Sequence, residues 1–409
     1  MKTTAIIAEY NPFHNGHKYL TETARELTGS DNMISIMSGC FVQRGAPAIC
    51  SKYHRTHMAL NNGCDVVFEL PVLYSLGSAE NFASGAVNLL CSLGTVDHIC
   101  FGSECGDIDA LSECASLLEE LSGTENFKEE LAVSIKNGAS YPSSFSAAVN
   151  SHLGEKAALL SSPNNILAIE YLRALIKAEK SGKYPCIPVP LTVKRIGSGY
   201  SDTNIDGLSS ATGIRKYVSE NNSVSEIKKC VPESVFDIIS DIYGKSFPVK
   251  EDDFSDMLFL RLNSLSNEEI LNIPDINMNL LHKLLSFKGK KILISDLIMS
   301  LKSKCFTYSA ISRALFRILL EPYYSAAFND SSERIPYLRL LGFKKNASEF
   351  LRGLRNSDSI RLITKPADAD MSDPGYLLDI YAANLYEQIC SNKYKTGFTE
   401  DLKTGPIIL

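Results

Sequence analysis

Two histidines, His14 and His17, lie three residues apart in the segment 11–17, "NPFHNGH", beside a proline and Gly16. A short apolar run precedes this segment and a helical pattern follows it, which predicts a turn from a strand into a helix. A glycine lets the backbone approach a ligand, a helix start offers unpaired N–H groups, and imidazoles donate hydrogen bonds to phosphate oxygens. These residues suit an anion site, while a polar turn whose histidines merely face solvent also accounts for them.

A second pair, His54 and His57, has the same spacing within a predicted helix. The two pairs together could in principle bind zinc, but neither has the H-E-x-x-H arrangement and no acidic third ligand lies at a suitable spacing. We therefore expect no metal site made of protein ligands. Lys52 and Arg55 of the same helix either face phosphates or pack by their aliphatic stems.

A third candidate is the hydroxyl cluster in "LSSATGIR", residues 208–215, which has the pattern of a helix start. Ser209, Ser210 and Thr212 could bind phosphate together with the N–H groups of that helix, and Arg215 would add a charged clamp. Taken alone, such a cluster is more often a simple helix cap.

Apolar strands alternate with helices through the first half of the chain, which predicts an α/β fold with a doubly wound parallel sheet. Ligands of such sheets bind at the carboxyl ends of the strands. The expected strands are residues 2–9, 32–39, 65–71 and 96–104, with a further strand within 186–195. The expected helices are residues 18–28, 51–63, 81–94 and 164–180, followed by a capped helix within 208–220.

Helical periodicity dominates beyond residue 220, and no convincing alternating strand follows. We therefore place a boundary near residue 220, between an α/β domain (1–220) and a mostly helical, locally basic domain (221–409). A chain of 409 residues is long enough for two or three domains.

The composition, 44% hydrophobic and 22% charged, is that of an ordinary globular protein. The sequence contains neither an apolar run of about 18 residues nor a signal-peptide pattern, so we expect a cytoplasmic protein with no membrane partner. Eleven scattered cysteines without a C-x-x-C pair indicate reduced thiols. Nothing in the sequence sets the oligomeric state.

Positive charge gathers in the last third of the chain, although the net charge is −6. Residues 282–320 hold eight Lys or Arg against one acid, and residues 334–355 hold six against one. Such runs are candidates for binding a polyanion. We expect Lys290, Lys291, Arg313 and Arg317 to contact RNA, the alternative being solvated helix faces.

The segment 14–17, "HNGH", is similar to the H-x-G-H signature of the HIGH-motif nucleotidyltransferase superfamily, and the cluster ending in Arg215 resembles its second phosphate-binding element. Over essentially the whole chain, the sequence resembles the bacterial tRNA(Met) cytidine acetate ligase family, most densely over residues 5–105. The segments that carry this resemblance are "IIAEYNPFHNGHKYL", "MSGCFVQRGAPAICSKYHRTHMALNNGCDVVFELPVLYSLGSAENFASGAV", "FGSECGD", "SPNNILAIEYL", "KRIGSGYSD" and "FTYSAISRALFRILL".

The resemblance implies an enzyme that forms acetyl-AMP from acetate and ATP and then acetylates the N4 amine of the wobble cytidine of elongator tRNA(Met). It implies ATP, together with Mg²⁺, as cofactors, and His14 and His17 as catalytic residues. Of the two adjacent asparagines in "SPNN", the resemblance implies Asn164 rather than Asn165 as an ATP contact. The ATP-binding residues that it implies are Ile7, Ala8, Glu9, Tyr10, Asn11, Pro12, Phe13, His14, Asn15, Gly16, His17, Lys18, Tyr19, Leu20, Gly102, Asn164, Arg195, Ile196, Ser210 and Arg215.

Two other functions use the same motifs. A nucleotidyltransferase acting on a small phosphorylated metabolite would need the N-terminal motifs but no RNA. A non-catalytic RNA-binding or scaffold protein would retain the nucleotide pocket and use the basic helices. The basic runs favour RNA over the metabolite, and the intact segment 14–17 favours catalysis over a scaffold.

Overall fold

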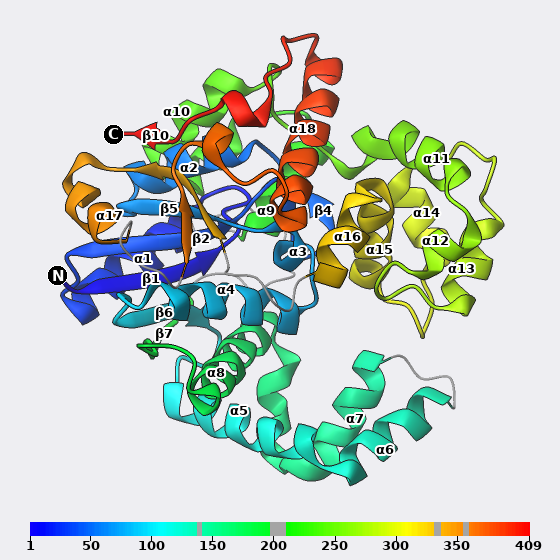
Figure 1. Cartoon of the computed structure of the whole chain (residues 1–409), viewed down its shortest axis with the longest axis horizontal. Helices are drawn as coiled ribbons and strands as arrows, with labels where there is room; N and C mark the ends of the chain where they lie inside the picture. Colours follow the sequence, from blue (N-terminus) through cyan, green and yellow to red (C-terminus); the bar gives the residue numbers. More distant parts are fainter. Residues whose placement is uncertain (137–140, 197–209, 331–336, 355–359) are drawn as a thin grey trace.

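The computed structural model describes residues 1–136, 141–196, 210–330, 337–354 and 360–409. Its centre is an eight-stranded sheet in the order β10-β8-β5-β2-β1-β6-β7, with β9 paired to β8 (Figure 1). The strands are β1 (Thr3–Ala8), β2 (Asn32–Ser38), β5 (Val66–Leu70), β6 (His98–Ser103), β7 (Val189–Lys194), β8 (Tyr337–Phe343), β9 (Arg361–Ile363) and β10 (Ile407–Ile408). The predicted α/β class is confirmed, and the strands from β5 to β7 are parallel.

Helices cover both faces of the sheet, which is why its central strands read as continuous apolar runs. Side chains alternate along each strand, so Ile6 and Met33 pack against Ala24 of one helix while Ala5 and Ile34 pack toward the opposite face. The covering helices are α1 (Asn15–Thr28) and α2 (Lys52–Asn61) on one face, and α4 (Ala79–Leu93) and α8 (Pro163–Ser181) on the other.

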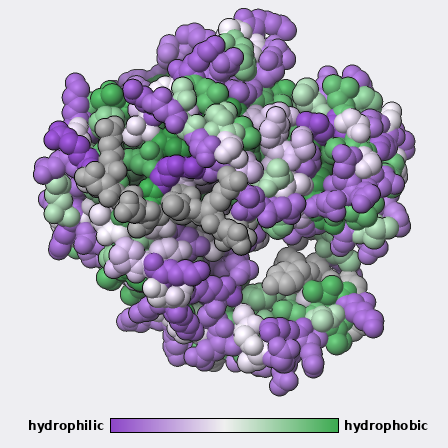
Figure 2. All heavy atoms as spheres, in the orientation of Figure 1, coloured by the Kyte–Doolittle hydropathy of each residue, from purple (hydrophilic) through white to green (hydrophobic). Residues whose placement is uncertain are grey.

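An arm of helices extends from α8 and forms the lower part of the molecule in Figure 1. The arm consists of α5 (Ile108–Gly123), α6 (Glu125–Lys136), α7 (Tyr141–Leu153) and the 3-10 segment η1 (Gly154–Ser161). Figure 2 shows that the surface is hollowed between this arm and the helices on the right, and that most of the visible surface is hydrophilic.

A second apolar core lies among the helices on the right of Figure 1, where Phe254 and Phe316 contact Phe41 of a small hairpin. The hairpin is β3 (Phe41–Val42) and β4 (Ala46–Pro47), followed after β5 by the short helix α3 (Val72–Ser75). The later helices are α9 (Ala211–Asn221), η2 (Glu226–Lys229), α10 (Glu233–Ile242), η3 (Glu251–Phe254), α11 (Ser255–Ser264), α12 (Asn267–Leu271), α13 (Met278–Leu285), α14 (Ile294–Leu301), α15 (Tyr308–Leu320), α16 (Tyr323–Asp330), η4 (Lys345–Ala347), α17 (Ser348–Leu354), η5 (Pro366–Asp368), α18 (Pro374–Tyr394) and η6 (Asp401–Lys403). Within the described ranges, no helix has both the length and the apolar character that crossing a membrane requires.

The expectation that no strand follows residue 220 is wrong. β8 pairs with β5 in the antiparallel direction, and β9 and β10 pair with β8, so the sheet draws on both sides of the predicted boundary. The sequence of β8, "YLRLLGF", includes the charged residue Arg339, which interrupts the apolar run that would otherwise indicate a buried strand. The chain after residue 220 is nevertheless mostly helical, as expected.

Arg339 is tolerated inside the protein because it belongs to a buried ion network. Lys52 Nζ lies 2.8 Å from Glu69 Oε2 and 3.1 Å from Asp401 Oδ1, and Arg339 pairs with Asp401. Although burial raises the pKa of Asp401, Lys52 and Arg339 outweigh that effect and hold the pKa below its ordinary value. Lys52 therefore belongs to the core of the fold rather than to a phosphate site.

Arg55 is also buried and holds backbone turns together. Its guanidinium donates to the carbonyl oxygens of Glu9 and Ser38 at 2.8 Å each, to Cys50 O at 3.2 Å, and to Gly39 O. The open choice between phosphate binding and packing is thus resolved as packing for Arg55, which ties the end of β2 to the residue that follows β1.

We predict that Asp401→Ala lowers the free energy of unfolding by about 3–5 kcal/mol, because it leaves the two buried cations Lys52 and Arg339 with the single carboxylate of Glu69 between them. Urea denaturation measures the change. The control is Asp241→Ala, which removes an exposed 3.1 Å pair with Lys245 and should cost at most about 0.5 kcal/mol. Equal effects of the two substitutions would contradict the structural role of the network.

Candidate active site

The two histidines of the first motif stack on one another at the start of α1, immediately beyond β1. Their ring centroids are 3.7 Å apart and the planes are 25° from parallel. Gly16 N–H donates to His14 Nδ1 at 3.1 Å, and His14 N–H donates to His17 Nδ1 at 3.2 Å. A neutral imidazole has one donor and one acceptor nitrogen, so Nε2 carries the proton in both rings and is the donor toward a ligand.

Both rings are neutral at neutral pH. Burial, helped by the positive charges of Arg195 and Arg215, lowers the pKa of His14 from 6.5 to about 3. Burial, then His14 and Arg195, lowers the pKa of His17 well below its ordinary value. The histidines therefore offer hydrogen bonds, and the arginines supply the positive charge that an anion needs.

The expectation that the start of α1 offers unpaired N–H groups is wrong, because each of these groups already donates within the protein. Asn15 N–H donates to Cys230 O at 2.9 Å, His17 N–H to His14 O at 2.9 Å, and Lys18 N–H to His14 O at 3.2 Å. Gly16 N–H is occupied by the His14 ring. Recognition of an anion at this turn consequently falls to side chains.

Gly16 allows the His14 ring to fold back over the helix start. A Cβ at this position would lie 2.9 Å from His14 Cε1 and 3.1 Å from His14 Nδ1, closer than a Cβ normally comes to other heavy atoms. Tyr10 and Phe13 contact the His17 ring of the stack, with ring centroids 5.0 and 5.4 Å from that of His17. The glycine of the motif is thus required by the imidazole packing.

The other members of the predicted ATP segment divide into buried and accessible positions. Ile7, Tyr10, Asn11, Pro12 and Phe13 are buried, and Asn11 Oδ1 accepts from Ile49 N–H at 2.7 Å. The partly or fully accessible positions are Ala8, Glu9, Asn15, Gly16, His17, Lys18, Tyr19 and Leu20. Of these, Leu20 also packs on the apolar core under α1, and Lys18 pairs with Glu22 at 3.7 Å.

The structure brings Arg215 of α9 beside the first motif. Its Nη1 donates to Asn11 O at 2.7 Å, and its Nη2 donates to Thr212 Oγ1 at 3.2 Å. Ser210 is the N-cap of α9, and its hydroxyl oxygen accepts from Gly213 N–H at 3.2 Å. Ser210 therefore acts as a helix cap, and Arg215 is the member of this cluster that lies in the site; Ser209 lies outside the described residues.

A further group of predicted residues meets where β6 and β7 end. Arg195 N–H donates to Ser103 O at 2.9 Å, and its side chain passes over Gly102, where a Cβ would lie 3.3 Å from Arg195 Cγ. Arg195 Nη1 reaches Asn164 Oδ1 at 3.4 Å. Ile196 follows, with 55% of its surface exposed.

Glu104, which the sequence analysis did not single out, organises this group. Its carboxylate accepts from Asn164 Nδ2 at 2.6 Å, from Asn164 N–H at 3.3 Å and from Asn165 N–H at 2.8 Å, so it caps α8. Asn165 is buried and returns the bonds by accepting from the N–H groups of Glu104 and Cys105. The geometry thus favours Asn164 as the asparagine open to a ligand. The sequence signal that could have identified Glu104 is an acidic residue directly after a predicted strand.

The second histidine pair does not join this site through any hydrogen bond or ring contact among the described residues. His54 Nδ1 lies 2.9 Å from Ser51 Oγ at the start of α2. Within the described part of the chain, no group of three or more His, Cys, Asp or Glu is placed to hold a metal ion.

Residues 1–401 match the family model described as HIGH Nucleotidyl Transferase. The chain therefore belongs to the HIGH nucleotidyltransferases. A Clostridium kluyveri protein named tRNA(Met) cytidine acetate ligase is 38% identical over 421 residues, covering 100% of this chain and 99% of its own. A Clostridium novyi protein of the same name is 36% identical over 414 residues, covering all of both chains. Within the class, the chain belongs to the tRNA(Met) cytidine acetate ligase family.

Two crystal structures of Thermotoga maritima TmcAL have the same fold. The apo structure matches with a TM-score of 0.88 and 29% identity, covering 100% of both chains. The structure bound with alpha-thio ATP matches with a TM-score of 0.86 over the same full coverage.

We predict that Gly16→Ala lowers the affinity for ATP by about 10- to 100-fold, because its methyl group displaces the His14 ring while alanine still suits a helix. Titration calorimetry measures the affinity, and circular dichroism checks the fold. Gly123→Ala is the matched control, since a Cβ there meets nothing within 4 Å. Unchanged ATP affinity in Gly16→Ala would show that the ring position does not matter.

Proposed function

We propose that this protein activates acetate with ATP, releasing pyrophosphate, and transfers the acetyl group from acetyl-AMP to the N4 amine of the wobble cytidine of elongator tRNA(Met). The observation that carries the proposal is the stack of two neutral imidazoles with Arg195 and Arg215 beside it, at the carboxyl ends of the strands. Relatives named for this activity match the whole chain. The reaction is proposed for the cytoplasm, where the eleven free thiols would stay reduced.

The first step needs no nucleophilic side chain. An acetate oxygen attacks the α-phosphorus and pyrophosphate leaves, so the protein contributes chiefly by positioning the reactants and stabilising charge. The Nε2–H groups of His14 and His17 would donate to phosphate oxygens, and Arg195 and Arg215 would offset the charge that develops there. Neutral imidazoles suit this task because they donate without having to exchange a proton.

Mg²⁺ belongs to the proposal only as a companion of the nucleotide. The described residues include no group of three or more carboxylate, imidazole or thiol ligands that could hold the ion. Mg²⁺ is commonly bound by substrate phosphates, water and one or two carboxylates, and here the phosphates would provide most of its ligands. The steps assigned to the protein's own residues do not pass through the ion.

The basic run 282–320 supports the RNA part of the proposal, with one correction. Arg317 is buried: it donates to Pro274 O at 2.9 Å and to Leu76 O at 3.0 Å, and pairs with Asp275 at 2.7 Å. The expectation that Arg317 contacts RNA is therefore wrong, and Arg313 is half-buried. The exposed cations around α13 and α14 are Lys283, Lys290, Lys291, Lys302 and Lys304.

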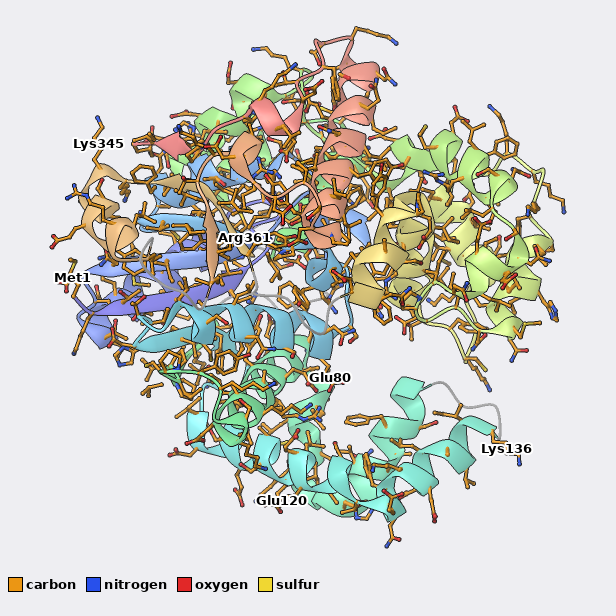
Figure 3. All side chains as sticks on the ribbon, viewed as in Figure 1. Met1, Glu80, Glu120, Lys136, Lys345 and Arg361 are labelled. Atoms are coloured by element: carbon orange, nitrogen blue, oxygen red, sulfur yellow. The ribbon has the colours of Figure 1, made fainter. Side chains whose placement is uncertain are left out.

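The second basic run lies elsewhere on the molecule. Because β8 runs against β5, it ends where β5 begins, and Lys344 N–H donates to Asp65 O at 2.8 Å. Figure 3 shows Lys345 on the same side as Met1, far from the helices at the right. This is the amino edge of the parallel strands, opposite to the histidines. We therefore propose the lysines around α13 and α14, rather than those near α17, as the RNA surface.

We predict that the purified protein, incubated with ATP, labelled acetate and total tRNA, places the label in acetylcytidine after the RNA is digested to nucleosides. His17→Ala should abolish the label by removing a phosphate donor, yet leave tRNA binding intact in a filter-binding assay. Absence of label while ATP is bound would favour the enzyme acting on a small phosphorylated metabolite. Loss of both activities in His17→Ala would show that ATP and RNA are not bound separately.

We predict that Lys290→Ala combined with Lys304→Ala weakens tRNA binding and reduces its salt dependence by about one to two counterions, because two phosphate contacts are lost. The matched control, Lys345→Ala combined with Arg352→Ala, removes the same charge from the opposite edge and should leave both unchanged. Filter binding at several salt concentrations measures the two quantities. Equal losses in the two double variants would refute the assignment of the surface.

A further inference from the structure

A carboxylate and a phenol from the helical region meet beside the candidate active site. Tyr308 Oη donates to Glu251 Oε1 at 2.7 Å, joining the first residue of α15 to the first residue of η3. Both side chains are half-buried. No described residue forms a hydrogen bond with the second carboxylate oxygen, Glu251 Oε2, among the contacts that the structure records.

Backbone hydrogen bonds tie this pair to the nucleotide loop. Val249 N–H, two residues before Glu251, donates to Ile49 O at 2.9 Å, and Ile49 N–H donates to Asn11 Oδ1 at 2.7 Å. Lys250 Nζ reaches Ser219 O, on the helix that carries Arg215, at 3.5 Å. The two bonds around Ile49 place the carboxylate near the loop that holds the histidines.

The hairpin β3–β4 provides a second connection, through α15. Gln43 N–H donates to Glu9 Oε1 at 2.9 Å, while Ser312 Oγ donates to Gly45 O. Gly45 has a φ of 76°, and a Cβ there would lie 2.3 Å from Arg313 N, so the hairpin rests directly on the helix. Tyr308 lies one turn before Ser312, which brings its phenol to the same side of the site.

The charges of Glu251 and Arg215 influence each other across this junction. Burial raises the pKa of Glu251, and Arg215 acts in the opposite direction. Burial lowers the pKa of Arg215, and Glu9 and Glu251 counter it. Figure 1 shows α9, which carries Arg215, between the sheet and the helices at the right.

The chemistry of a carboxylate at this position matches the second substrate rather than the first. ATP and acetate are anions, which a carboxylate repels. The exocyclic amine of cytosine is a hydrogen-bond donor, and Glu and Asp are the side chains that accept from it. A carboxyl group whose pKa is raised by burial is also a better base than an exposed one.

We propose that Glu251 receives the acceptor amine: Oε2 accepts a hydrogen bond from N4–H of the cytosine, while Tyr308 holds the carboxylate through Oε1. In the transfer step the N4–C bond to the acetyl group forms, the acetyl C–O bond to the adenylate breaks, and AMP leaves with that electron pair. One N4 proton passes to the Glu251 carboxylate. This assignment of a catalytic residue rests on the proposed function, and Tyr308 is a positioning residue within it.

Measuring the two half-reactions separately, acetate activation and acetyl transfer, distinguishes this role from a purely structural one. Glu251→Gln should leave acetate-dependent exchange of labelled pyrophosphate into ATP, measured without tRNA, within about twofold of the wild type. The same variant should lose at least about 100-fold in the rate of acetyl transfer to tRNA, because it keeps the shape but cannot take the proton. Its tRNA affinity in filter binding should not change.

The matched control is Glu321→Gln, which alters another burial-shifted carboxyl group that is hydrogen-bonded to a hydroxyl, that of Ser325 at 2.7 Å. Glu321→Gln should leave the rates of both half-reactions unchanged. Tyr308→Phe, which retains the ring, should slow transfer by about 3- to 10-fold through kcat with the KM for tRNA unchanged. Transfer at the wild-type rate in Glu251→Gln, or an equal fall of both half-reactions, would overturn the proposal. A wild-type protein that transfers nothing to tRNA would instead refute the proposed function.

Discussion

Backbone N–H groups occupy the Nδ1 atoms of both His14 and His17, and the rest of the site depends on this constraint. It assigns the proton of each ring to Nε2 and holds the rings 3.7 Å apart. The same arrangement uses the amides that a helix start would otherwise offer to an anion. An anion is therefore bound by two side-chain donors rather than by backbone N–H groups. Both imidazoles remain neutral because burial and two arginines disfavour the protonated form.

The positive charges beside this turn come from residues that are distant in sequence. Arg215 is fixed by its bond to Asn11 O, and Arg195 by its backbone bond to Ser103 O. The loop itself is fastened on its other sides by Ile49, which binds Asn11 Oδ1, and by Cys230 O, which accepts from Asn15 N–H. Arrangements of this kind favour catalysis by positioning, since the donors need not reorganise when charge develops. The helical region therefore helps the sheet to position the histidine loop.

Local pattern was sufficient for the parallel strands and for α1, α2, α4 and α8, because buried parallel strands are short apolar runs between capped helices. The helices α5, α6 and α7 were not among the predicted elements. It failed at β8, where the apolar character is interrupted by Arg339 and the compensating Asp401 is far along the chain. The motif residues could be predicted as a site because a glycine and two histidines at fixed spacing form a specific pattern. Glu104 was missed since its role as a cap appears only when β6 and α8 meet. Charge counting could not distinguish the buried Arg317 from exposed lysines, as burial depends on tertiary contacts.

The antiparallel pairing of β5 with β8 also constrains how the chain is assembled. Lys52 and Asp401, which meet beneath this pairing, are separated by 349 residues. During synthesis the edge of β5 stays open until residues near 343 have emerged, and an open strand edge is a template for intermolecular pairing. Contacts of such long sequence separation form late because the loop entropy must be overcome first. The order of translation therefore leaves this edge of β5 unpaired until the C-terminal part of the chain has been made.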